Sequence, residues 1–592
     1  MSARASAASA GQGVNDNVWA ADCETDPFDG KTIPEPFVWG AYNIADGTYF
    51  EFWTTGEFLA WARKGKKTVY AHNGGKFDWH YVLPEIPLYS RVKVINGRLA
   101  KFKIGDCEFR DSWNILPLPL SQYKKDDIDY AKFTRDMRSQ HMDEIRRYLK
   151  NDCVYLAELV DTFRKEHGNA LTLAGAAMKF WEKQTGEKAD RTDALFYDTF
   201  SPWYAGGRVQ CFEYGEVQGP IHDVDINSAY PRAMMEEHAY GSTFAELDEL
   251  PSERDEVSRC FIELEAESTG AFFFRSATGR LGFPSDGKLR TFHVTGWEYN
   301  SAVDTGTLRN ARIVRVVRFA RTVNFRVYVN HWYGLKSSLK KGTAHYIISK
   351  FFLNSLYGKF GANPAKYRDY EIIELADIYA AMNDNPELSL ENIEGDLALV
   401  SIPTPEAQQR YFNVATAASI TGYVRAVLWR AICGAKGVVY CDTDNIKARD
   451  VGDLNIDPVA LGGWSPDATY THGYIAGKKL YSFTDGKKWT TASKGVKLTS
   501  DEVRRVALGE IVEWKAEAPT FRVNGNTVYE GENIGHVKRD GVEQMFTHRK
   551  VRMVRTDDRE LDICPTPKTQ KARKSANALL QQRQELRSLF RP

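Results

Sequence analysis

The stretch Val439-Tyr440-Cys441-Asp442-Thr443-Asp444-Asn445 carries two carboxylates one residue apart at the end of an apolar, β-favouring run. Residues i and i+2 of a strand project from the same face, so we expect Asp442 and Asp444 to point together from a strand end or hairpin tip. Paired carboxylate oxygens suit a divalent cation such as Mg²⁺. The alternative interpretation is a polar hairpin turn, because Asp and Asn favour turns. The other motifs of the chain decide between the two.

The composition excludes several classes of protein. With 592 residues, 43% hydrophobic and 12% aromatic, the chain is long and apolar enough for several folded domains. None of the eight cysteines forms a CxxC pair, which argues against a zinc site or a disulfide framework and favours a reducing compartment. No run approaches the roughly 20 apolar residues of a membrane span, and no P-loop signature indicates work driven by ATP.

The formal charges cancel, with 78 Lys+Arg and 78 Asp+Glu, but they are segregated along the chain. Residues 305–368 hold thirteen Lys or Arg and no acid, residues 369–409 hold ten acids and no base, and the tail from Pro565 holds seven bases and one acid. The long basic stretch predicts a phosphate-binding surface. For the acidic block we consider three interpretations: repulsion of phosphate that keeps a strand on its path, docking of a basic priming protein, or a solvated loop.

Four carboxylates in the first 152 residues form a second pattern. Asp22 and Glu24 are spaced i, i+2 in an apolar run, Asp78 follows a glycine turn, and Tyr148 and Asp152 share one face of a predicted helix. Taken singly, each fits a capping, turn or surface role. Taken together, on two strands and a helix, they match the needs of a two-metal site for phosphodiester hydrolysis.

Three segments, Asp22–Thr25 (DCET), Asn73–Asp78 (NGGKFD) and Tyr148–Asp152 (YLKND), resemble the motifs of the DEDD-type 3′–5′ exonuclease that precedes family B DNA polymerases. Segments that resemble polymerase motifs follow in the family's order. They are Tyr204–Gly207 (the YxGG linker), Asp223–Pro231 (motif A), Lys350–Gly358 (motif B), Tyr440–Asp444 (motif C) and Lys479–Tyr481 (KxY). So many motifs in order, over essentially the whole chain, outweigh any single match.

The resemblance is greatest to the protein-primed polymerases of small phages, linear plasmids and adenoviruses. The first motif begins near residue 22, which leaves no room for the long N-terminal domain of cellular family B enzymes. Lys125–Tyr130 resembles an extra exonuclease segment of this subgroup. The 120 positions from residue 230 to 350 and the 82 from residue 358 to 440 can each hold one of the subgroup's two insertions.

The resemblance implies an α/β multidomain fold, in which an RNase H-like exonuclease precedes a right-hand polymerase with palm, fingers and thumb. The expected parts are a flexible leader (1–17), the exonuclease (18–188), the first part of the palm (189–260), the first insertion (261–332), the fingers (333–368), the acidic second insertion (369–412), the second part of the palm (413–515), and the thumb with a basic tail (516–592).

The resemblance also implies roles for residues of the polymerase site. Asp225 and Asp444, with the Ile226 carbonyl, are expected to bind metal, and Asp442 to be an acidic catalytic neighbour. The expected nucleotide-binding residues are Ile226, Ser228, Tyr230, Lys350, Asn354 and Tyr357, with Tyr230 under the sugar as the selector of deoxynucleotides. The expected DNA-binding residues of this part are Tyr204, Gly206, Gly207, Lys479 and Tyr481.

In the exonuclease, Asp22, Glu24, Asp78 and Asp152 are expected to bind metals, Tyr148 to orient the attacking water, and Lys125 to offset charge on the scissile phosphate. The single-stranded primer end would be held by Thr25, Asn73, Phe77, Ser112 and Tyr130. Phe77 fits a core position equally well. Two departures from the family pattern are Ala229, where a larger residue is usual, and Asn445, where Ser is common; from Asn445 we expect little consequence.

The expected function is DNA-directed DNA synthesis with 3′–5′ proofreading, primed by a protein and displacing a strand, on a linear viral or plasmid genome. Two Mg²⁺ per active site, or Mn²⁺ in their place, are the implied cofactors. The expected partners are template and primer DNA, dNTPs and a terminal priming protein, with no membrane and a monomeric enzyme in the cytoplasm of a prokaryotic host; a eukaryotic organelle is the alternative. Two rival functions are the same catalyst started from nucleic-acid primers or without a primer, and a non-catalytic DNA-binding scaffold.

Overall fold

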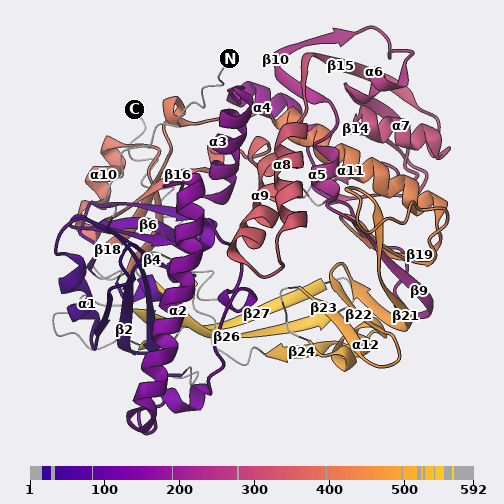
Figure 1. Cartoon of the computed structure of the whole chain (residues 1–592). Helices are drawn as coiled ribbons and strands as arrows, with labels where there is room; N and C mark the ends of the chain where they lie inside the picture. The colour runs from indigo at the N-terminus through magenta and orange to yellow at the C-terminus, as the bar shows by residue number, and fades with distance from the viewer. Residues whose placement is uncertain are drawn as a thin grey trace, which may run out of the picture.

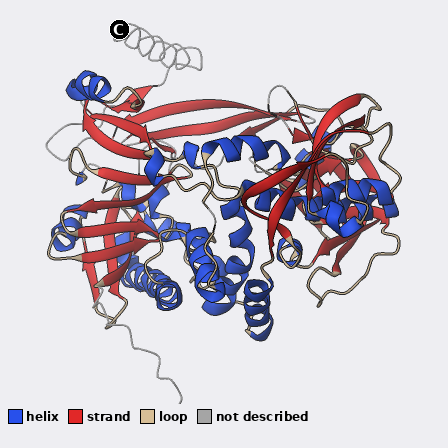
Figure 2. Cartoon of the chain, turned by 90° about the horizontal axis from the view of Figure 1, so that it is seen from above, coloured by secondary structure: helices blue, strands red, loops and turns tan. Residues whose placement is uncertain are grey.

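The computed structural model describes residues 17–27, 34–82, 85–189, 191–276, 279, 281–394, 397–494, 496, 498–515, 522–524, 527–538, 541–552 and 563–565. The predicted leader, apart from its last residue, and nearly all of the basic tail lie outside these ranges. The described chain forms two bodies, with helices α8 and α9 between them and the long strands β26 and β27 running along one side (Figures 1 and 2).

The first body is built on a sheet of ten described strands. In spatial order they are β17 (Ser389–Glu394), β18 (Leu397–Pro403), β16 (Arg368–Glu374), β5 (Arg91–Ile95), β6 (Arg98–Ile104), β7 (Cys107–Asp111), β4 (Lys67–Ala71), β1 (Val18–Thr25), β2 (Pro36–Asn43) and β3 (Tyr49–Phe52). Strand β4 pairs in parallel with both β1 and β7. On the outer sides, β1 pairs antiparallel with β2, and β7 pairs antiparallel with β6. Strand β1 is buried on both faces, as its nearly continuous apolar run requires.

Helix α2 (Arg138–His167) packs against β1 and β2 of this sheet. Its buried residues, among them Ile145, Leu149 and Leu156, recur at the spacing of one helix face. Gly168 ends the helix with a φ of 63°, a left-handed value that glycine adopts without a steric penalty. The other helices of this body are α1 (Thr55–Ala62) and α10 (Ile378–Asp384).

The acidic block after residue 368 continues the first sheet, although it lies far along the chain. Strand β16 pairs with β5, the Tyr89 amide donates to the Ile372 carbonyl at 2.7 Å, and Lys93 forms an ion pair with Asp369. Much of the block is therefore strand and helix, which excludes the solvated-loop interpretation for the described part.

The second body contains an antiparallel sheet of seven described strands. In spatial order they are β23 (Trp489–Ser493), β22 (Leu480–Thr484), β21 (Trp464–Gly477), β9 (Gly215–Ile226), β20 (Asn445–Asp450), β19 (Lys436–Asp442) and β8 (Val209–Cys211). Helices α5 (Ala229–Ala233), α11 (Val414–Gly434) and α12 (Ser500–Ala507) contact its strands or one another. Helix α4 (Ala194–Phe200) packs elsewhere, with Phe200 on Phe261 and Phe319. Strands β19 and β20 form a hairpin, so the predicted hairpin tip at Asp442–Asn445 is confirmed.

A smaller antiparallel sheet lies beside it, in the order β10 (His238–Leu247), β15 (Arg312–Val323), β11 (Cys260–Glu267) and β14 (Leu289–Thr295). The short pair β12 (Phe274–Arg275) and β13 (Leu281–Gly282) and helices α6 (Arg254–Ser258) and α7 (Gly296–Asp304) belong to the same region.

The arginines of β15 are paired with carboxylates. Arg312 contacts Glu265, Arg315 contacts Glu246 and Arg318 contacts Glu256. This part of the basic stretch is therefore not the open phosphate-binding surface that the run of cations predicted.

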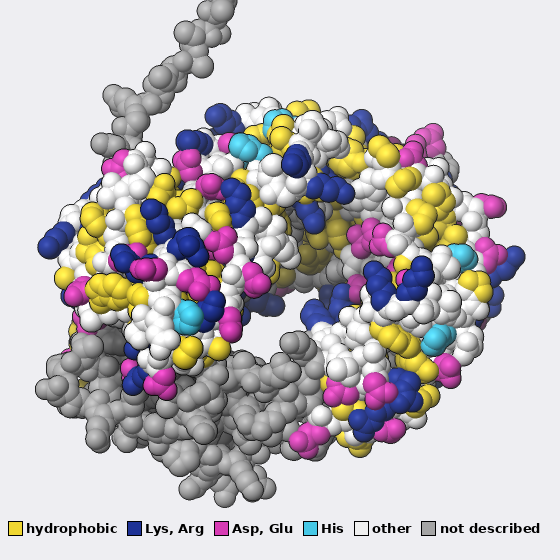
Figure 3. Space-filling view, turned by 60° about the horizontal axis from the view of Figure 1, so that its bottom comes forward, with side chains coloured by type: hydrophobic (Ala, Val, Ile, Leu, Met, Phe, Trp, Pro, Cys, Tyr) yellow, Lys and Arg dark blue, Asp and Glu magenta, His cyan; other side chains and the backbone are white. Residues whose placement is uncertain are grey.

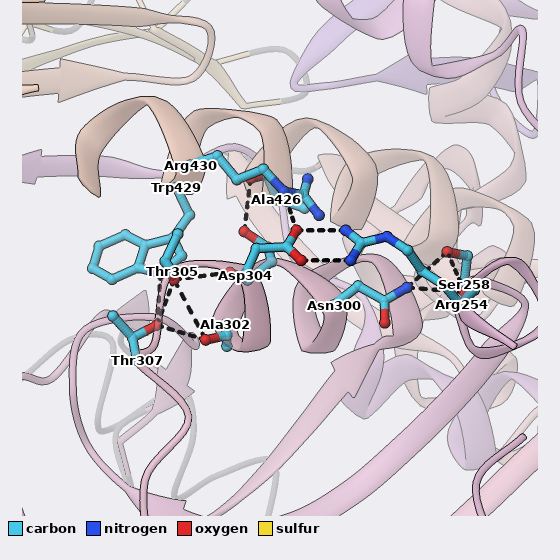
Figure 4. Close-up of polar contacts among 11 residues, drawn as sticks. Arg254, Ser258, Asn300, Ala302, Asp304, Thr305, Thr307, Ala426, Trp429 and Arg430 are labelled. Carbon is cyan, nitrogen blue, oxygen red and sulfur yellow. Dashed lines mark hydrogen bonds and ion pairs between the residues drawn. The ribbon is translucent and has the colours of Figure 1, made fainter. Parts of the chain in front are cut away.

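Helix α7 is fixed to α11 through Asp304, its last residue. Both Asp304 carboxylate oxygens accept from Arg254 of α6, and one also accepts from Arg430 Nε of α11 at 2.7 Å (Figure 4). The hydrogen bond from Arg254, and then that from Arg430, lowers the pKa of Asp304 to about 2. Trp429 of α11 adds a hydrogen bond from its ring to the Thr307 hydroxyl at 3.1 Å.

Helices α8 (Arg326–Ser338) and α9 (Ala344–Phe360) pack on each other and on α3 (Leu173–Thr185). A third sheet contains β24 (Val512–Lys515), β26 (Thr527–Lys538), β27 (Gly541–Arg552) and β28 (Ile563–Pro565), with β25 (Arg522–Asn524) paired to β26. A space-filling view shows an opening between the bodies, with Lys and Arg side chains at several points of its rim (Figure 3). No helix among the described residues has the length and apolar character to cross a membrane.

Candidate active sites

The end of β9 and the β19–β20 hairpin bring together the first carboxylate cluster. The Ile226 amide donates to the Asp444 carbonyl at 2.8 Å, which places Asp225 and Asp444 on adjoining strand ends. Thr443 has a φ of 65°, unusual for a β-branched residue, and its amide donates to the Arg208 carbonyl at 2.6 Å. The linker segment after residue 204 therefore supports the turn that presents Asp444.

The three acids of this cluster have different partners. Asp442 accepts from Lys479 Nζ at 2.6 and 2.8 Å, whereas no described Lys or Arg lies within ion-pair distance of Asp225 or Asp444. Burial, followed by the charge of Asp444, raises the pKa of Asp225 to about 7, and burial raises the pKa of Asp444 to about 6. Asp225 and Asp444, two half-buried acids without a paired cation, form a donor set that fits a divalent metal. Asp442, whose charge is paired with Lys479, fits the predicted role of an acidic neighbour of that site.

Several predicted nucleotide-binding residues lie close to this cluster. The rings of Tyr230 and Tyr357 are stacked, with centroids 4.3 Å apart and an interplanar angle of 8°. Ser228 has a φ of 56° and its hydroxyl accepts from Lys336 Nζ at 3.2 Å. Lys350 and Asn354 lie on the exposed side of α9, and the Asn354 amide donates only to its own helix, at the Lys350 carbonyl.

Gly207 of the linker allows close approach of the backbone to the motif C turn. A Cβ atom added at Gly207 would lie 2.7 Å from Thr443 Cγ2, which is too short for a real contact. No atom lies within 4 Å of a Cβ added at Gly206. Tyr204 is half buried and lies against Gly361, at the end of α9. The Tyr481 ring packs against that of Tyr440, with centroids 4.7 Å apart and ring planes tilted by 57°. The Lys479 amide donates to the Tyr440 hydroxyl at 3.0 Å.

The first body holds the second carboxylate cluster. Asp22 and Glu24 lie on β1, Asp152 and Tyr148 lie on α2, and the charges of all four acids act on one another. Asp78 was expected on a strand, and this is wrong. The glycine turn after Asn73 continues into short 3-10 turns, and Asp78 begins one of them, where its carboxylate accepts from the Cys23 amide at 3.2 Å.

Burial dominates the electrostatics of this cluster. It raises the pKa of Asp22, Glu24, Asp78 and Asp152, with Asp78 at about 6. Glu24 Oε1 and Asp152 Oδ1 are buried without a hydrogen-bond partner, and the nearest cation is Lys125, at 3.5 Å from Asp152 Oδ2. Unpaired buried carboxylate oxygens fit a bound cation, because leaving such groups unsatisfied is costly.

The four acids do not form a closed metal cage by themselves. Within the described ranges, no group of three or more His, Cys, Asp or Glu side chains has an arrangement that could hold a metal ion unaided.

The residues predicted to hold a single strand differ in their contacts and exposure. The Asn73 side chain accepts from Arg98 at 2.5 Å, and the Ser112 hydroxyl lies 2.9 Å from His72 Nδ1. Tyr130 is 54% exposed and its hydroxyl lies 3.2 Å from that of Tyr148. Thr25 and Phe77 make local contacts: the Thr25 hydroxyl donates to the Asp26 carbonyl, and the Phe77 ring packs edge-on against Tyr81.

A buried ion pair that no sequence motif indicated joins helices α7 and α11 to the linker. Arg425 of α11 donates to both Glu298 oxygens at 2.7 and 3.1 Å, with side chains only 2% and 3% exposed. Arg425 also donates to the carbonyls of Ala205 and Gly206 in the linker. Neither residue stands in a motif that we had singled out, and the two are 127 positions apart, so no local pattern could have paired them.

We expect Arg425→Met to destabilise the second body by about 3–5 kcal/mol, because the Glu298 charge would be left buried without a partner. Urea unfolding followed by tryptophan fluorescence measures this. The double variant Arg425→Met/Glu298→Gln, which removes both charges, should recover at least about half of the loss. Equal instability of the single and double variants would contradict the explanation.

Comparison with known proteins defines the class. A family model described as DNA polymerase type B, organellar and viral, matches residues 117–426. The chain is 35% identical over 555 residues to a DNA-directed DNA polymerase of Enterobacteria phage PRD1, covering 87% of this chain and 97% of that one. It is 23% identical over 510 residues to a DNA polymerase of Bacillus phage phi29, covering 75% and 83%.

Solved structures agree in fold. The phi29 DNA polymerase complexed with primer-template DNA and incoming nucleotide matches with a TM-score of 0.66 at 18% identity, covering 90% of this chain and 99% of that chain. The same polymerase with single-stranded DNA matches with a TM-score of 0.67 at 20% identity, covering 89% and 100%. The protein thus has the multidomain fold of a family B polymerase and is a DNA-directed DNA polymerase. It belongs to the type B DNA polymerases of the organellar and viral family.

Proposed function

We propose that this polymerase replicates a linear viral or plasmid genome and proofreads with its own 3′–5′ exonuclease, each reaction in a separate site that uses Mg²⁺, or Mn²⁺ in its place. The observation that carries the proposal is the presence of two separate clusters of buried or half-buried acids, one at Asp225 and Asp444 and one at Asp22, Glu24, Asp78 and Asp152. Bound divalent cations would stabilise the charge on phosphate oxygens and make the attacking oxygen a better nucleophile.

In the polymerase site, Asp225 and Asp444 with the Ile226 carbonyl would hold the cations. Lys479 is paired with Asp442, and together with Tyr481 of the same KxY element it would position the primer end. Lys350, on the exposed side of α9, would meet the triphosphate as a point charge, and Asn354 and Tyr357 would contact the sugar and base. Lys336 on α8 and Lys340 and Lys341 in the loop after it would add positive charge for the triphosphate, since the charges of Lys350 and Lys341 already act on Lys336.

In the exonuclease site, Tyr148 would orient the attacking water and Lys125 would offset charge on the scissile phosphate, since it already faces Asp152. Thr25, Asn73, Phe77, Ser112 and Tyr130 would hold the single-stranded end; stacking of a base on an aromatic ring contributes about 1–3 kcal/mol. The first sheet, with three parallel strands beside antiparallel ones and α2 on one face, supports an RNase H-like exonuclease for residues 18–188.

Initiation from a protein hydroxyl is proposed from the similarity to phage polymerases, with residues 261–332 and 369–412 as the two insertions. The phage relatives also support the cytoplasm of a prokaryotic host as the place of action. The remaining boundaries are proposed as predicted: palm in 189–260 and 413–515, fingers in 333–368, and thumb within 516–592.

The proposal is tested on the wild-type protein with Mg²⁺. We expect extension of a primed template, shortening of a single-stranded 3′ end without dNTPs, and displacement at a nick. For protein priming, labelled dNTP should enter a protease-sensitive, nuclease-resistant band when host or phage extract supplies the priming protein and the template has no nucleic-acid primer. Extension only from nucleic-acid primers would contradict protein priming, and no shortening of the 3′ end would contradict proofreading.

Selection of deoxynucleotides gives a further prediction. Tyr230→Val is expected to raise ribonucleotide incorporation by about 10–100-fold, because the ring that would meet a 2′-hydroxyl is lost. Tyr230→Phe is the matched control, since it keeps the ring stacked on Tyr357 and should keep the selectivity. Competition between CTP and dCTP on one template measures both variants; unchanged selectivity in the Val variant would contradict the role.

A further inference from the structure

A buried charge pair lies immediately beside the polymerase carboxylates. Lys447 Nζ is 2.5 Å from Asp223 Oδ2, and the two side chains are 6% and 7% exposed. Neither residue is among the proposed metal-binding, nucleotide-binding or DNA-binding residues. A buried ion pair is weak evidence for stability, because its desolvation opposes its attraction, so its position needs another explanation.

The strand register shows what the pair touches. In the antiparallel pair β9–β20, Asn445 is opposite Asp225 and Lys447 is opposite Asp223. Because residues i and i+2 share a face, the four side chains form a block of two adjacent cross-strand pairs, one with Asp225 and the next with the ion pair.

Hydrogen bonds connect the block. Asn445 Nδ2 donates to Asp223 Oδ1 at 2.6 Å, Lys447 Nζ donates to Asn445 Oδ1 at 3.3 Å, and the Tyr470 hydroxyl donates to Asp223 Oδ2 at 3.2 Å. Asn445, a departure from the family pattern from which little was expected, therefore ties motif C to motif A.

Aromatic rings enclose the ammonium group. Lys447 Nζ lies 5.7 Å from the ring centre of Tyr481, 5.9 Å from that of Phe483 and 6.0 Å from that of Tyr470. Tyr481 is the tyrosine of the KxY element, and its ring packs at a tilt of 57° against that of Tyr440, the first residue of motif C. One ammonium group thus contacts residues of motif A, motif C and KxY.

The pair also affects the charge around Asp225. Lys447 is paired with Asp223, one cross-strand pair away from Asp225. Loss of Lys447 would leave Asp223 as an uncompensated carboxylate next to the cluster that must accept divalent cations.

We propose that Lys447 is a positioning residue of the polymerase site, which, held by Asp223, fixes Asn445 and the Tyr481 ring and so sets the placement of Asp225 relative to Asp444. The inference rests on the proposed function of these two acids. It assigns Lys447 no contact with nucleotide or DNA.

The test compares Lys447→Met with the double variant Asp223→Asn/Lys447→Met in the full-length protein. Single-turnover nucleotide addition, the half-saturating Mg²⁺ concentration and the thermal midpoint are measured for both. We expect Lys447→Met to slow nucleotide addition by at least about tenfold, about 1.4 kcal/mol in barrier height, to raise the Mg²⁺ requirement, and to lower the thermal midpoint. In the double variant the midpoint should return close to that of wild type, while addition stays slow and the Mg²⁺ requirement stays high.

The matched control is Lys436→Met on the neighbouring strand, whose side chain is 85% exposed; it should leave all three values unchanged. Recovery of nucleotide addition together with stability in the double variant would overturn the inference, because the pair would then only avoid a buried lone charge. A normal rate and Mg²⁺ requirement in Lys447→Met would overturn it as well. Asp225→Ala distinguishes failure of the proposed polymerase site from failure of the inference about Lys447. If Asp225→Ala still extends primers, the proposed site is wrong. If it is inactive while Lys447→Met is normal, only the inference fails.

Discussion

Asp444→Ala is expected to slow nucleotide addition by at least about 1,000-fold, which corresponds to about 4 kcal/mol of lost transition-state stabilisation. Asp444 lies on the hairpin tip beside Asp225 with no described cation as partner. Its removal takes away one of the two carboxylates proposed to bind the divalent cations. Rapid-quench measurement of single-nucleotide addition to a primed template determines the rate.

The matched control for this variant is Asp450→Ala, at the far end of strand β20, which begins directly after Asp444; the Asp450 carboxylate is half exposed. It should add nucleotides at the wild-type rate. Shortening of a single-stranded 3′ end should also be normal in Asp444→Ala, because the exonuclease acids lie in the other body. A rate for Asp444→Ala within about tenfold of wild type would mean that the cluster is not the polymerase site.

Asp152→Ala is expected to slow removal of 3′ nucleotides by at least about 1,000-fold, with nucleotide addition unchanged. Asp152 Oδ1 is a buried oxygen without a hydrogen-bond partner, and its other oxygen faces Lys125, so it is well placed to hold a cation. Loss of dNMP from a labelled single strand, followed without dNTPs, measures the effect.

Asp143→Ala, on the same helix but fully exposed, is the matched control and should degrade the strand normally. Loss of activity in both variants would point to damage of helix α2 instead of the site. Normal degradation by Asp152→Ala would remove Asp152 from the exonuclease.

The sequence predicted the local part of both sites. A strand ending in two acids, a helix with Tyr148 and Asp152 on one face, and the hairpin at motif C follow from spacing within ten residues, and the structure has each of them. Asp78 was misplaced because the glycines after Asn73 permit a 3-10 turn as readily as an extended segment.

The remaining features depend on partners distant in sequence. Neither the pairing of Asp442 with Lys479 nor that of Lys447 with Asp223 has a local signal, because the charges meet only when separate strands of one sheet adopt their register. The same reason explains why the acidic block could not be foreseen as an extension of the first sheet through β5. The β15 arginines show the reverse error: their run looked unpaired only because their carboxylates lie on other strands.

If the chain holds two separate sites, one primer assay can separate synthesis from degradation. A 5′-labelled primer on a template is incubated with Mg²⁺, with and without dNTPs, and the product lengths are compared for wild type, Asp444→Ala, Asp152→Ala and the double variant. We expect longer and shorter products for wild type, only shorter products for Asp444→Ala, only longer products for Asp152→Ala, and an unchanged primer for the double variant. Extension by Asp444→Ala, or shortening by Asp152→Ala, would contradict the assignment of two separate sites.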